Sequence, residues 1–369
     1  MTDTSSMRTV PMNDLSRGIE WDRFHFKSAL KSVLDSGFVE KGFNHAAFAA
    51  ELASYLGVSK SIGVVSGIDA LKLSSKAAGP QGRNLVLTAA NAGGYTSTAA
   101  KRADFNTVFV DVEKGSLCMS AETIDAGLID DVGVVLVTHL YGNFTDIQEI
   151  VEQCDERGIQ VVEDCAESIG ARRESRFAGS VGDFAAISFY LTKNLGAIGD
   201  GGAVVTTDAE LTSKVRQLSQ NGGDSKCSVE LPGGLNSQLD AHQAALLTVR
   251  LPLLDSFDER RYEIVGRYAA AAVGTSITLM PADTDSHVAH LAVARSANRE
   301  RAQQALRQAN DMTDVYLPVP YHWQPGFGSS AVSLPITILA FREVFSLPCF
   351  PELMEEKILT VCDAIGTLA

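Results

Sequence analysis

The sequence contains one lysine in a setting that suits carbonyl chemistry. Between residues 184 and 198, Lys193 is the only ionisable side chain besides Tyr190. Apolar surroundings disfavour the charged ammonium, and a neutral lysine amine is the nucleophile that condenses with aldehydes and ketones. The glycines that follow, up to Gly202, leave room for a ligand at the backbone. The alternative is a surface lysine that extends its amine into water, and we rank it lower.

A second segment could bind an anion. In residues 64–71, a predicted strand runs through Ser66 and Gly67 directly into a predicted helix. Such a turn directs free backbone N–H groups and the positive end of the helix dipole at one point. An ordinary strand-to-helix turn capped by Ser66 or Asp69 explains the same residues, and for this segment alone it is the more frequent case.

A third segment with possible chemistry is a predicted strand that is followed directly by the acidic residue Asp164. Asp164 stands at the carboxyl end of the predicted strand 160–163, and open α/β sheets bind their ligands at this end of their strands. Simple capping of the next turn would explain Asp164 equally well. Glu163 points to the other side of the strand because side chains alternate there, so we predict a structural role for it.

Two further polar segments have ordinary structural explanations. Residues 234–240 resemble a helix start, with Asn236 or Ser237 as the capping residue. His139, which precedes Leu140 and Tyr141, is predicted to be structural rather than catalytic.

Alternating short strands and helices must position these residues. Predicted strands lie at 61–65, 85–88, 107–112, 132–138, 160–163, 185–190 and 202–207. Helical patterns lie at 22–36, 46–55, 69–77, 96–102, 121–128 and 147–157. Several of the strands are apolar throughout, which is typical of strands buried on both faces. The order predicts an α/β fold with a mostly parallel sheet between two layers of helices.

The strand pattern weakens after residue 210. Residues 211–219 and 237–267 are mainly helical, with a break expected at Pro252. Beyond them we predict a strand at 286–294, a helix at 297–308 and a last helix at 351–368. We therefore predict a large α/β domain over residues 1–250 and a smaller C-terminal α+β domain over residues 251–369.

Composition excludes several classes of protein. The chain has 369 residues and a formal net charge of −14, which argues against nucleic-acid binding. No apolar run is long enough to cross a membrane, and we see no signal peptide at the start. The six cysteines form no C-x-x-C pair, which argues against zinc and disulfides and suits a reducing cytoplasm.

Taken together, the motifs resemble a known family. They are S-G-I-D-A-L, V-T-H-L-Y-G, V-V-E-D-C-A, the run S-F-Y-L-T-K-N-L-G-A-I-G-D-G-G, and G-L-N-S-Q-L-D. P-V-P-Y-H-W-Q-P at 318–325 and S-L-P at 346–348 extend the set. The chain is similar to the DegT/DnrJ/StrS family of pyridoxal-phosphate-dependent sugar aminotransferases. That resemblance implies the aspartate aminotransferase-like fold (type I), with a mostly parallel central sheet.

The resemblance assigns roles to the residues around the cofactor. Lys193 would hold pyridoxal phosphate as a Schiff base and then move a proton between the substrate carbon and the cofactor. Asp164 would pair with the pyridine nitrogen and keep it protonated. The backbone of Gly67 and Ile68, with Ser188, would bind the phosphate.

The resemblance also implies a shared active site. Asn236 would reach the phosphate in the neighbouring subunit, so the active unit would be a homodimer. Tyr95 is the nearest candidate for the aromatic side chain that covers the cofactor ring.

Some positions depart from the family pattern. Ile68 stands where Thr is common, and Glu167, at the cofactor, where Gln or His is frequent. Gln238 replaces a frequent basic residue, and Tyr316 a frequent His. Lys193 and Asp164 match the pattern, so the central chemistry is retained.

Three residues match family positions near the substrate, namely His290, Arg295 and His322. For each, a helix-face or strand-face residue with a local partner is an equally good interpretation.

The implied reaction moves an amino group from an amino acid, by family analogy L-glutamate, to a keto group of a nucleotide-linked deoxysugar. Pyridoxamine phosphate would form in the first half of the cycle. The resemblance leaves open dTDP, UDP or GDP as the nucleotide, and C3 or C4 as the carbon aminated. The alternatives are a pyridoxamine-phosphate-dependent keto-sugar dehydratase, disfavoured by the lysine at 193, and a non-catalytic regulatory protein that binds the cofactor.

Overall fold

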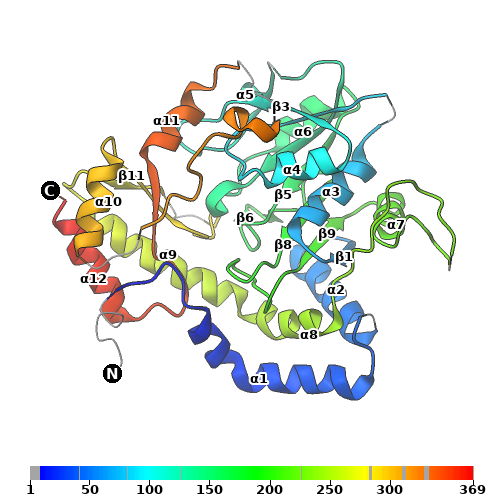
Figure 1. Ribbon diagram of the computed structural model, residues 1–369, viewed down its shortest axis with the longest axis horizontal. Coiled ribbons are helices and arrows are strands. Elements are labelled where there is room, and N and C mark those ends of the chain that lie inside the picture. The colour runs from blue at the N-terminus through cyan, green and yellow to red at the C-terminus, as the bar shows by residue number, and fades with distance from the viewer. Residues whose placement is uncertain are drawn as a thin grey trace.

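The central feature of the fold is a seven-stranded sheet covered by helices on both faces (Figure 1). The computed structural model describes residues 9–40, 42–80, 82–125, 127–225, 227–281, 285–309, 313–327 and 332–368. The strand order is β1-β9-β8-β5-β4-β2-β3. Their bounds are β1 (Lys60–Val64), β2 (Leu85–Ala89), β3 (Asn106–Val110), β4 (Val132–Thr138), β5 (Gln160–Asp164), β8 (Phe184–Ser188) and β9 (Gly202–Thr206).

The sheet is mostly parallel, as the sequence predicts. Strand β9 is the exception, because it runs antiparallel to both β1 and β8. All seven predicted strands are present, shifted at their ends by a few residues. Each alternate residue of β4 enters a different core: Val134 and Leu136 pack toward α3 and α4, and Val135 and Val137 pack on the other face. Two buried faces explain why these strands are apolar throughout.

Helices connect and cover the strands. In the part that precedes residue 254 they are α1 (Leu15–Ser36), α2 (Phe43–Leu56), α3 (Gly67–Ala78), α4 (Tyr95–Arg102), α5 (Ala121–Asp125), α6 (Gln148–Asp155), α7 (Ala209–Leu218) and α8 (Ala241–Arg250). Helix α5 is shorter than predicted, and residue 126 of that prediction lies outside the described residues. The capping side chains agree with the sequence rules: Ser66 accepts from Asp69 N, and Asp208 from Glu210 N.

The C-terminal part adds a second, three-stranded sheet. Its antiparallel strands are β10 (Thr278–Leu279), β11 (Ala292–Arg295) and β12 (Val344–Leu347). Its helices are α9 (Leu254–Ala271), α10 (Arg299–Gln308), α11 (Pro335–Glu343) and α12 (Glu355–Gly366). Short 3-10 turns occupy Leu140–Gly142, Leu251–Leu253, Tyr321–Trp323 and Pro325–Phe327, and a two-stranded ribbon joins β6 (Arg172–Arg173) to β7 (Arg176–Phe177).

The predicted strand at 286–294 is wrong for most of its length. The backbone turns at Ala289, whose φ of 45° lies in the left-handed region, and β11 begins only at Ala292. The break expected at Pro252 is confirmed, because a 3-10 turn there separates α8 from α9. This turn is where we propose to divide the large domain (residues 1–250) from the small one (residues 251–369).

Both ends of the chain contribute to the C-terminal core. Val10 is fully buried beside Ile358 and Val361 of α12, and Lys357 Nζ donates a hydrogen bond to the carbonyl oxygen of Thr9. All six cysteines are free thiols. Among the described residues, no helix combines the length and apolar character that crossing a membrane requires.

Candidate active site

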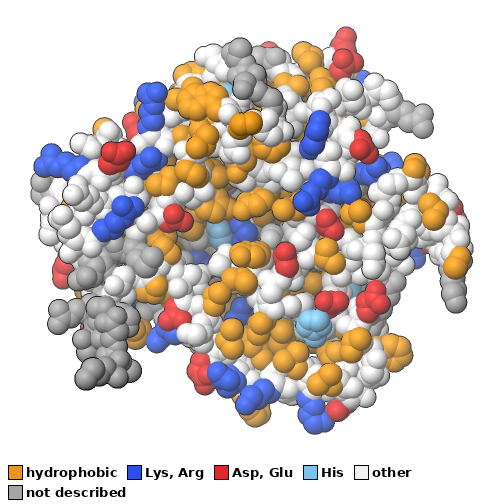
Figure 2. All heavy atoms as spheres, in the orientation of Figure 1, with side chains coloured by type: hydrophobic (Ala, Val, Ile, Leu, Met, Phe, Trp, Pro, Cys, Tyr) orange, Lys and Arg blue, Asp and Glu red, His pale blue; other side chains and the backbone are white. Residues whose placement is uncertain are grey.

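A cavity of about 500 Å³ opens at the carboxyl ends of the parallel strands. It brings together eight of the predicted residues: Gly67, Ile68, Tyr95, Asp164, Glu167, Ser188, Lys193 and His290. The hollow is visible near the middle of the face in Figure 2. The sequence predicted these residues from segments that are up to more than two hundred residues apart. They meet because the carboxyl ends of the parallel strands lie at one edge of the sheet.

The strand-to-helix turn at one end of the cavity has the properties of an anion site. Helix α3 begins at Gly67, and its first intrahelical hydrogen bond runs from Ala70 N to Ser66 O. The N–H groups of Gly67 and Ile68 precede that bond, so they are available to a ligand. The backbone is tightly packed here: a Cβ on Gly67 would lie 2.7 Å from the Cβ of Ser188.

The same turn is pressed against the start of β9. A Cβ on Gly202 would lie only 2.5 Å from the carbonyl carbon of Ser66, so glycine is required there. Ser188 ends β8 and pairs with Gly202 across the antiparallel ladder. The segment that carries Lys193 therefore begins and ends against the anion turn.

Asp164 ends β5 and faces the cavity with its carboxylate held in place. Its Oδ2 accepts a hydrogen bond from Thr138 Oγ1 at 3.3 Å, and its Oδ1 accepts one from Ala166 N at 3.1 Å. Burial raises the pKa of Asp164 to about 6, against the lowering effect of the Ala166 N–H and of Lys193. A buried carboxylate of this kind favours a positively charged partner in the cavity.

Lys193 follows β8 and has an acid beside it. Its Nζ donates to Oε1 of Glu167 at 3.2 Å, and both side chains are largely buried. The expectation of uncharged surroundings is therefore wrong. The local sequence contains no acid, but the fold supplies one from 26 residues earlier in the chain.

Glu167 is the centre of a cluster of hydrogen-bond donors. Besides the Lys193 amine, it accepts from the hydroxyl of Tyr316 and from the backbone N–H of Tyr141. Burial alone would raise the pKa of Glu167, but the Lys193 ammonium, His290 and these donors lower it to about 2. Glu167 is therefore an anion, and Tyr316 is held as a neutral donor.

His290 lies against the same cluster. Its Nε2 is 3.7 Å from Oε1 of Glu167, and its Nδ1 is 2.8 Å from Oδ1 of Asn194. Burial, and then the nearby Lys193 ammonium, lower the pKa of His290 to about 3. The ring is therefore neutral at ordinary pH.

The structural roles predicted for Glu163 and His139 are confirmed. Glu163 accepts hydrogen bonds from the N–H groups of Gly179, Val181 and Gly182, and it lies 2.9 Å from His139 Nε2. Both side chains are fully buried, away from the lining of the cavity.

Three predicted residues lie outside the cavity lining, and one of them, Arg295, donates hydrogen bonds to the carbonyl oxygen of Lys114 and to Glu343 instead. Asn236 is exposed and forms an isolated bridge with Gln220. His322 is buried in a 3-10 turn beside Phe109 and Trp323. Tyr95 does line the cavity, with half of its surface exposed, at the first position of α4.

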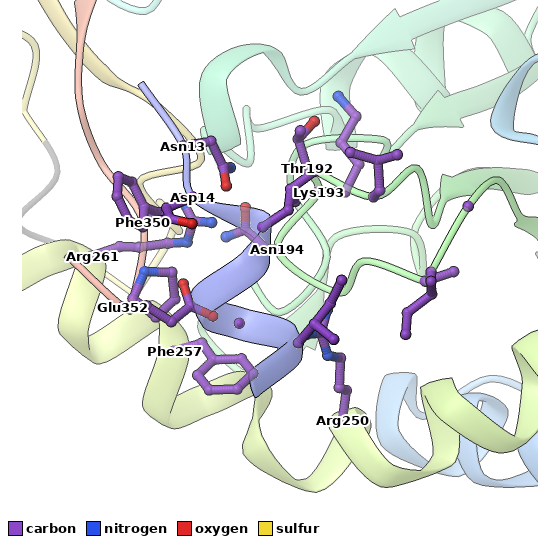
Figure 3. A pocket seen from close by; sticks show the side chains of 18 residues that line it. Asn13, Asp14, Thr192, Lys193, Asn194, Arg250, Phe257, Arg261, Phe350 and Glu352 are labelled. Carbon is purple, nitrogen blue, oxygen red and sulfur yellow. The ribbon is translucent and has the colours of Figure 1, made fainter. Parts of the chain in front are cut away.

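A smaller cavity of about 110 Å³ lies on the other side of the lysine segment (Figure 3). Asn13 and Asp14 of the N-terminal segment line it together with Asn194 and with Arg261 of α9. Arg261 donates hydrogen bonds to the carbonyl oxygens of His290 and Cys349. Sequence reasoning gave no role to Asn194 or Arg261, because their partners are distant in the chain.

Known proteins share this architecture over nearly its full length. The profile of the DegT/DnrJ/EryC1/StrS aminotransferase family matches residues 22–366. The dTDP-3-amino-3,4,6-trideoxy-alpha-D-glucose transaminase of Micromonospora megalomicea is 35% identical over 94% of this chain and 95% of its own. Among solved structures, DesV of S. venezuelae superposes with a TM-score of 0.92 at 34% identity, covering 97% of this chain and 98% of DesV.

A further structure was determined with a ligand in place. NtdA of Bacillus subtilis, with bound cofactor PMP, has a TM-score of 0.91 at 26% identity and covers 98% of this chain and 85% of its own. The predicted fold is confirmed by these neighbours, and the family resemblance by the profile match. This chain is a member of the DegT/DnrJ/EryC1/StrS aminotransferase family.

Proposed function

We propose that the protein is a pyridoxal-phosphate-dependent aminotransferase that acts on a nucleotide-linked keto-deoxysugar. One observation carries the proposal: the Lys193 amine, the Asp164 carboxylate and the N-terminus of α3 surround the same cavity of about 500 Å³. An amine, an acid and an anion site are the three groups that this cofactor needs, at its aldehyde, its ring nitrogen and its phosphate.

The residues present fit the cofactor. The free N–H groups at the start of α3 suit a phosphate, and glycine at 67 keeps the approach open beside Ser188. The buried Asp164, whose pKa is raised to about 6, gains stability when a cationic N–H group enters the cavity. Tyr95 stands at the rim, where a flat ring could pack against it.

Pyridoxal phosphate, when bound, supplies an aldehyde that condenses with amines and a ring that accepts electrons. Lys193 would hold the cofactor through its amine and would carry a proton to or from the substrate carbon. Asp164, oriented by hydrogen bonds from Thr138 and Ala166, would accept the hydrogen of the ring nitrogen. Glu167 keeps the Lys193 side chain directed into the cavity whenever its amine is free.

Relatives support the substrate class. The transaminase from Micromonospora megalomicea is named for a dTDP-linked amino sugar, and a relative in Acidithiobacillus ferrooxidans, 34% identical, for a UDP-linked one. We propose L-glutamate as the amino donor, from the family resemblance. The large cavity exceeds what a cofactor ring alone requires, which leaves space for a sugar.

The active unit that we propose is a homodimer. Four large apolar side chains in and just after α1 are between 66% and 82% exposed, namely Phe24, Leu34, Phe38 and Phe43. Such a group of exposed apolar side chains is typical of a protein–protein contact surface. Figure 2 shows hydrophobic side chains along the edge where α1 and α8 lie. Exposed Asn236 is placed outside this chain's own cavity, so it would act on a partner's cofactor.

Introducing charges on this apolar surface tests the proposed dimer. The double substitution Phe24→Glu and Phe43→Glu should give monomers by analytical ultracentrifugation, whereas Val273→Glu should not. Val273, two residues after the end of α9, is 83% exposed and is far along the chain from the proposed interface. Dimers that persist in the double variant would contradict the proposed contact surface.

We also propose a cytoplasmic location, which the six free thiols support.

The lysine provides the direct test of the reaction. Lys193→Ala should remove the visible absorbance of the bound cofactor and lower turnover by more than about a thousandfold. Lys101→Ala, an exposed lysine in α4, should change neither. Full activity in the Lys193 variant would refute the proposal.

Product analysis then identifies the substrate. Mass spectrometry of reactions with glutamate and a panel of dTDP-, UDP- and GDP-linked keto sugars should show an amino sugar from at least one. Consumption of a keto sugar without any requirement for an amino donor would instead indicate a dehydratase. Cofactor binding with neither product would indicate a regulatory protein.

A further inference from the structure

A chain of hydrogen bonds leads from α9 to the active-site cavity. Asp258 is buried in α9, and its Oδ1 accepts from Nδ2 of Asn194 at 2.7 Å. Oδ1 of Asn194 in turn lies 2.8 Å from Nδ1 of His290. The three side chains come from distant segments, and each is at most 5% exposed.

The orientation of the Asn194 amide follows from its neighbours. Its Nδ2 also donates to the carbonyl oxygen of Val288 at 3.0 Å. A backbone carbonyl can only accept, so the reversed amide would set its oxygen against the Val288 carbonyl and leave a buried acceptor unsatisfied, at a cost of about 1–3 kcal/mol. The amide oxygen therefore faces His290.

The state of the histidine follows in turn. An amide oxygen can only accept, so Nδ1 of His290 must carry the hydrogen. In the neutral ring, Nε2 then carries a lone pair and no hydrogen. Nε2 faces the cavity side of the ring, 3.7 Å from Oε1 of Glu167.

The backbone of His290 is also fixed. Arg261 donates a hydrogen bond to its carbonyl oxygen at 3.1 Å, and the close approach of Gly142 on the other side leaves no room for a Cβ. Asn194 and Arg261 both line the small cavity behind the lysine segment (Figure 3). Asn194 therefore holds the imidazole at Nδ1, and Arg261, which lines both cavities, holds the backbone of His290.

We propose that Asn194, fixed by Asp258 and Val288, holds His290 as the Nδ1–H tautomer, so that Nε2 and Glu167 form a pair of acceptors for a hydrogen-bond donor on the substrate. The donor is an N–H of the amino acid or an O–H of the sugar, and this assignment rests on the proposed aminotransferase function. Asn194 and Asp258 are positioning residues, because they act through His290. Two acceptors 3.7 Å apart can share one N–H or O–H group placed between them.

The tautomer is measured without any turnover. In the cofactor-loaded enzyme with ¹⁵N-labelled histidine, NMR separates ring nitrogens that carry a hydrogen from those that do not. The signals that vanish in His290→Asn belong to His290. They should show hydrogen on Nδ1 and a bare Nε2 from pH 6 to pH 8, and Asn194→Ala should populate the other tautomer. A hydrogen on Nε2 in the wild-type enzyme would overturn the proposal.

Two substitutions then separate the acceptor from its support. His290→Asn can retain the contact with Asn194 but has no atom at the Nε2 position, whereas His290→Gln can place an amide oxygen there. We expect the Asn variant to raise one KM at least about tenfold, as loss of a buried hydrogen bond does, and the Gln variant to raise it less. A higher KM for glutamate identifies the amino acid as the donor, and a higher KM for the keto sugar identifies the sugar.

The outcomes distinguish this proposal from the general function. If both KM values in a folded His290→Asn variant stay within about twofold of wild type, the acceptor role is wrong, although the enzyme remains an aminotransferase. If Lys193→Ala is fully active, the aminotransferase assignment fails, and the NMR result still reports whether Asn194 fixes the tautomer.

Discussion

Oε1 of Glu167 lies 3.2 Å from Nζ of Lys193 and also accepts the hydroxyl hydrogen of Tyr316. One carboxylate oxygen thus holds both the amine and a neutral phenol at the edge of the cavity. The family resemblance leads us to expect Gln or His at this position. Glu167 adds a negative charge to the site. That charge depends on the protonation of the Glu167 carboxylate, and the dependence can be measured.

Glu167→Gln should destabilise the cofactor-free protein near neutral pH. The pKa of Glu167 is lowered to about 2, from 4.5, so its ionised form contributes stability that is present above pH 4.5 and is lost as the pH falls toward 2. The difference corresponds to about 3 kcal/mol at pH 7. Urea unfolding of both proteins at pH 7 and pH 4 checks this, and a gap that widens at the lower pH would contradict it.

Asp164→Asn should have opposite effects on stability and activity. Burial raises the folded pKa of Asp164 to about 6, from 3.8, so the cofactor-free protein loses stability as the pH rises through this range. The variant escapes that loss, by up to about 3 kcal/mol at pH 8, while turnover falls at least about a hundredfold. Thermal unfolding at pH 5 and pH 8 measures the first effect. The exposed Asp130→Asn serves as the control and should change neither quantity.

Gly142→Ala should disturb the position of His290. The backbone at Gly142 has a φ of 96°, and a Cβ there would lie 2.9 Å from the backbone nitrogen of His290. Gly158→Ala is the matched control, because its φ of 61° is also left-handed but nothing lies within 4 Å. We expect a cost of about 1 kcal/mol for the control and at least about 2 kcal/mol more for Gly142. Equal losses in urea unfolding would show that the contact with His290 does not matter.

Ile68→Thr should tighten the binding of pyridoxal phosphate. Ile68 is half-buried at the second position of α3 and lines the cavity, so a hydroxyl there can donate to an anion already bound by the backbone. A hydrogen bond to a charged group contributes about 1.5 kcal/mol, or about tenfold in affinity. Ile68→Val has the shape of threonine without the hydroxyl. Absorbance titration should therefore separate the two variants, and equal affinities would place the phosphate elsewhere.

The sequence predicted the large sheet better than the small one. Strands such as β4 and β8 are marked by short apolar runs, because each is buried on both faces of the sheet. The run from Ser286 to Ala294 is also largely apolar, but the chain turns at Ala289, and His290 lines the cavity. Nothing local distinguishes these cases, since the difference lies in contacts with Gly142 and Arg261.

The site shows the same limit. The placement of Lys193, Asp164 and Gly67 at one cavity was predictable, because each stands at or just after a strand end in a segment whose residue types suit one chemical task. The ion pair with Glu167 and the bonds of Asn194 were not, because Asn194 contacts residues 64 and 94 positions away. Polar pairs of this kind leave no periodic pattern in a sequence.

The lysine segment leaves the sheet at Ser188 and returns at Gly202, and both ends touch the turn from Ser66 to Gly67. Motion of the lysine segment and motion of the turn are consequently coupled. Inorganic phosphate alone, bound at the turn, should slow amide hydrogen exchange across residues 189–201. Because the antiparallel strand β9 contacts the turn, phosphate bound at the turn would also restrict the segment that carries the Lys193 amine.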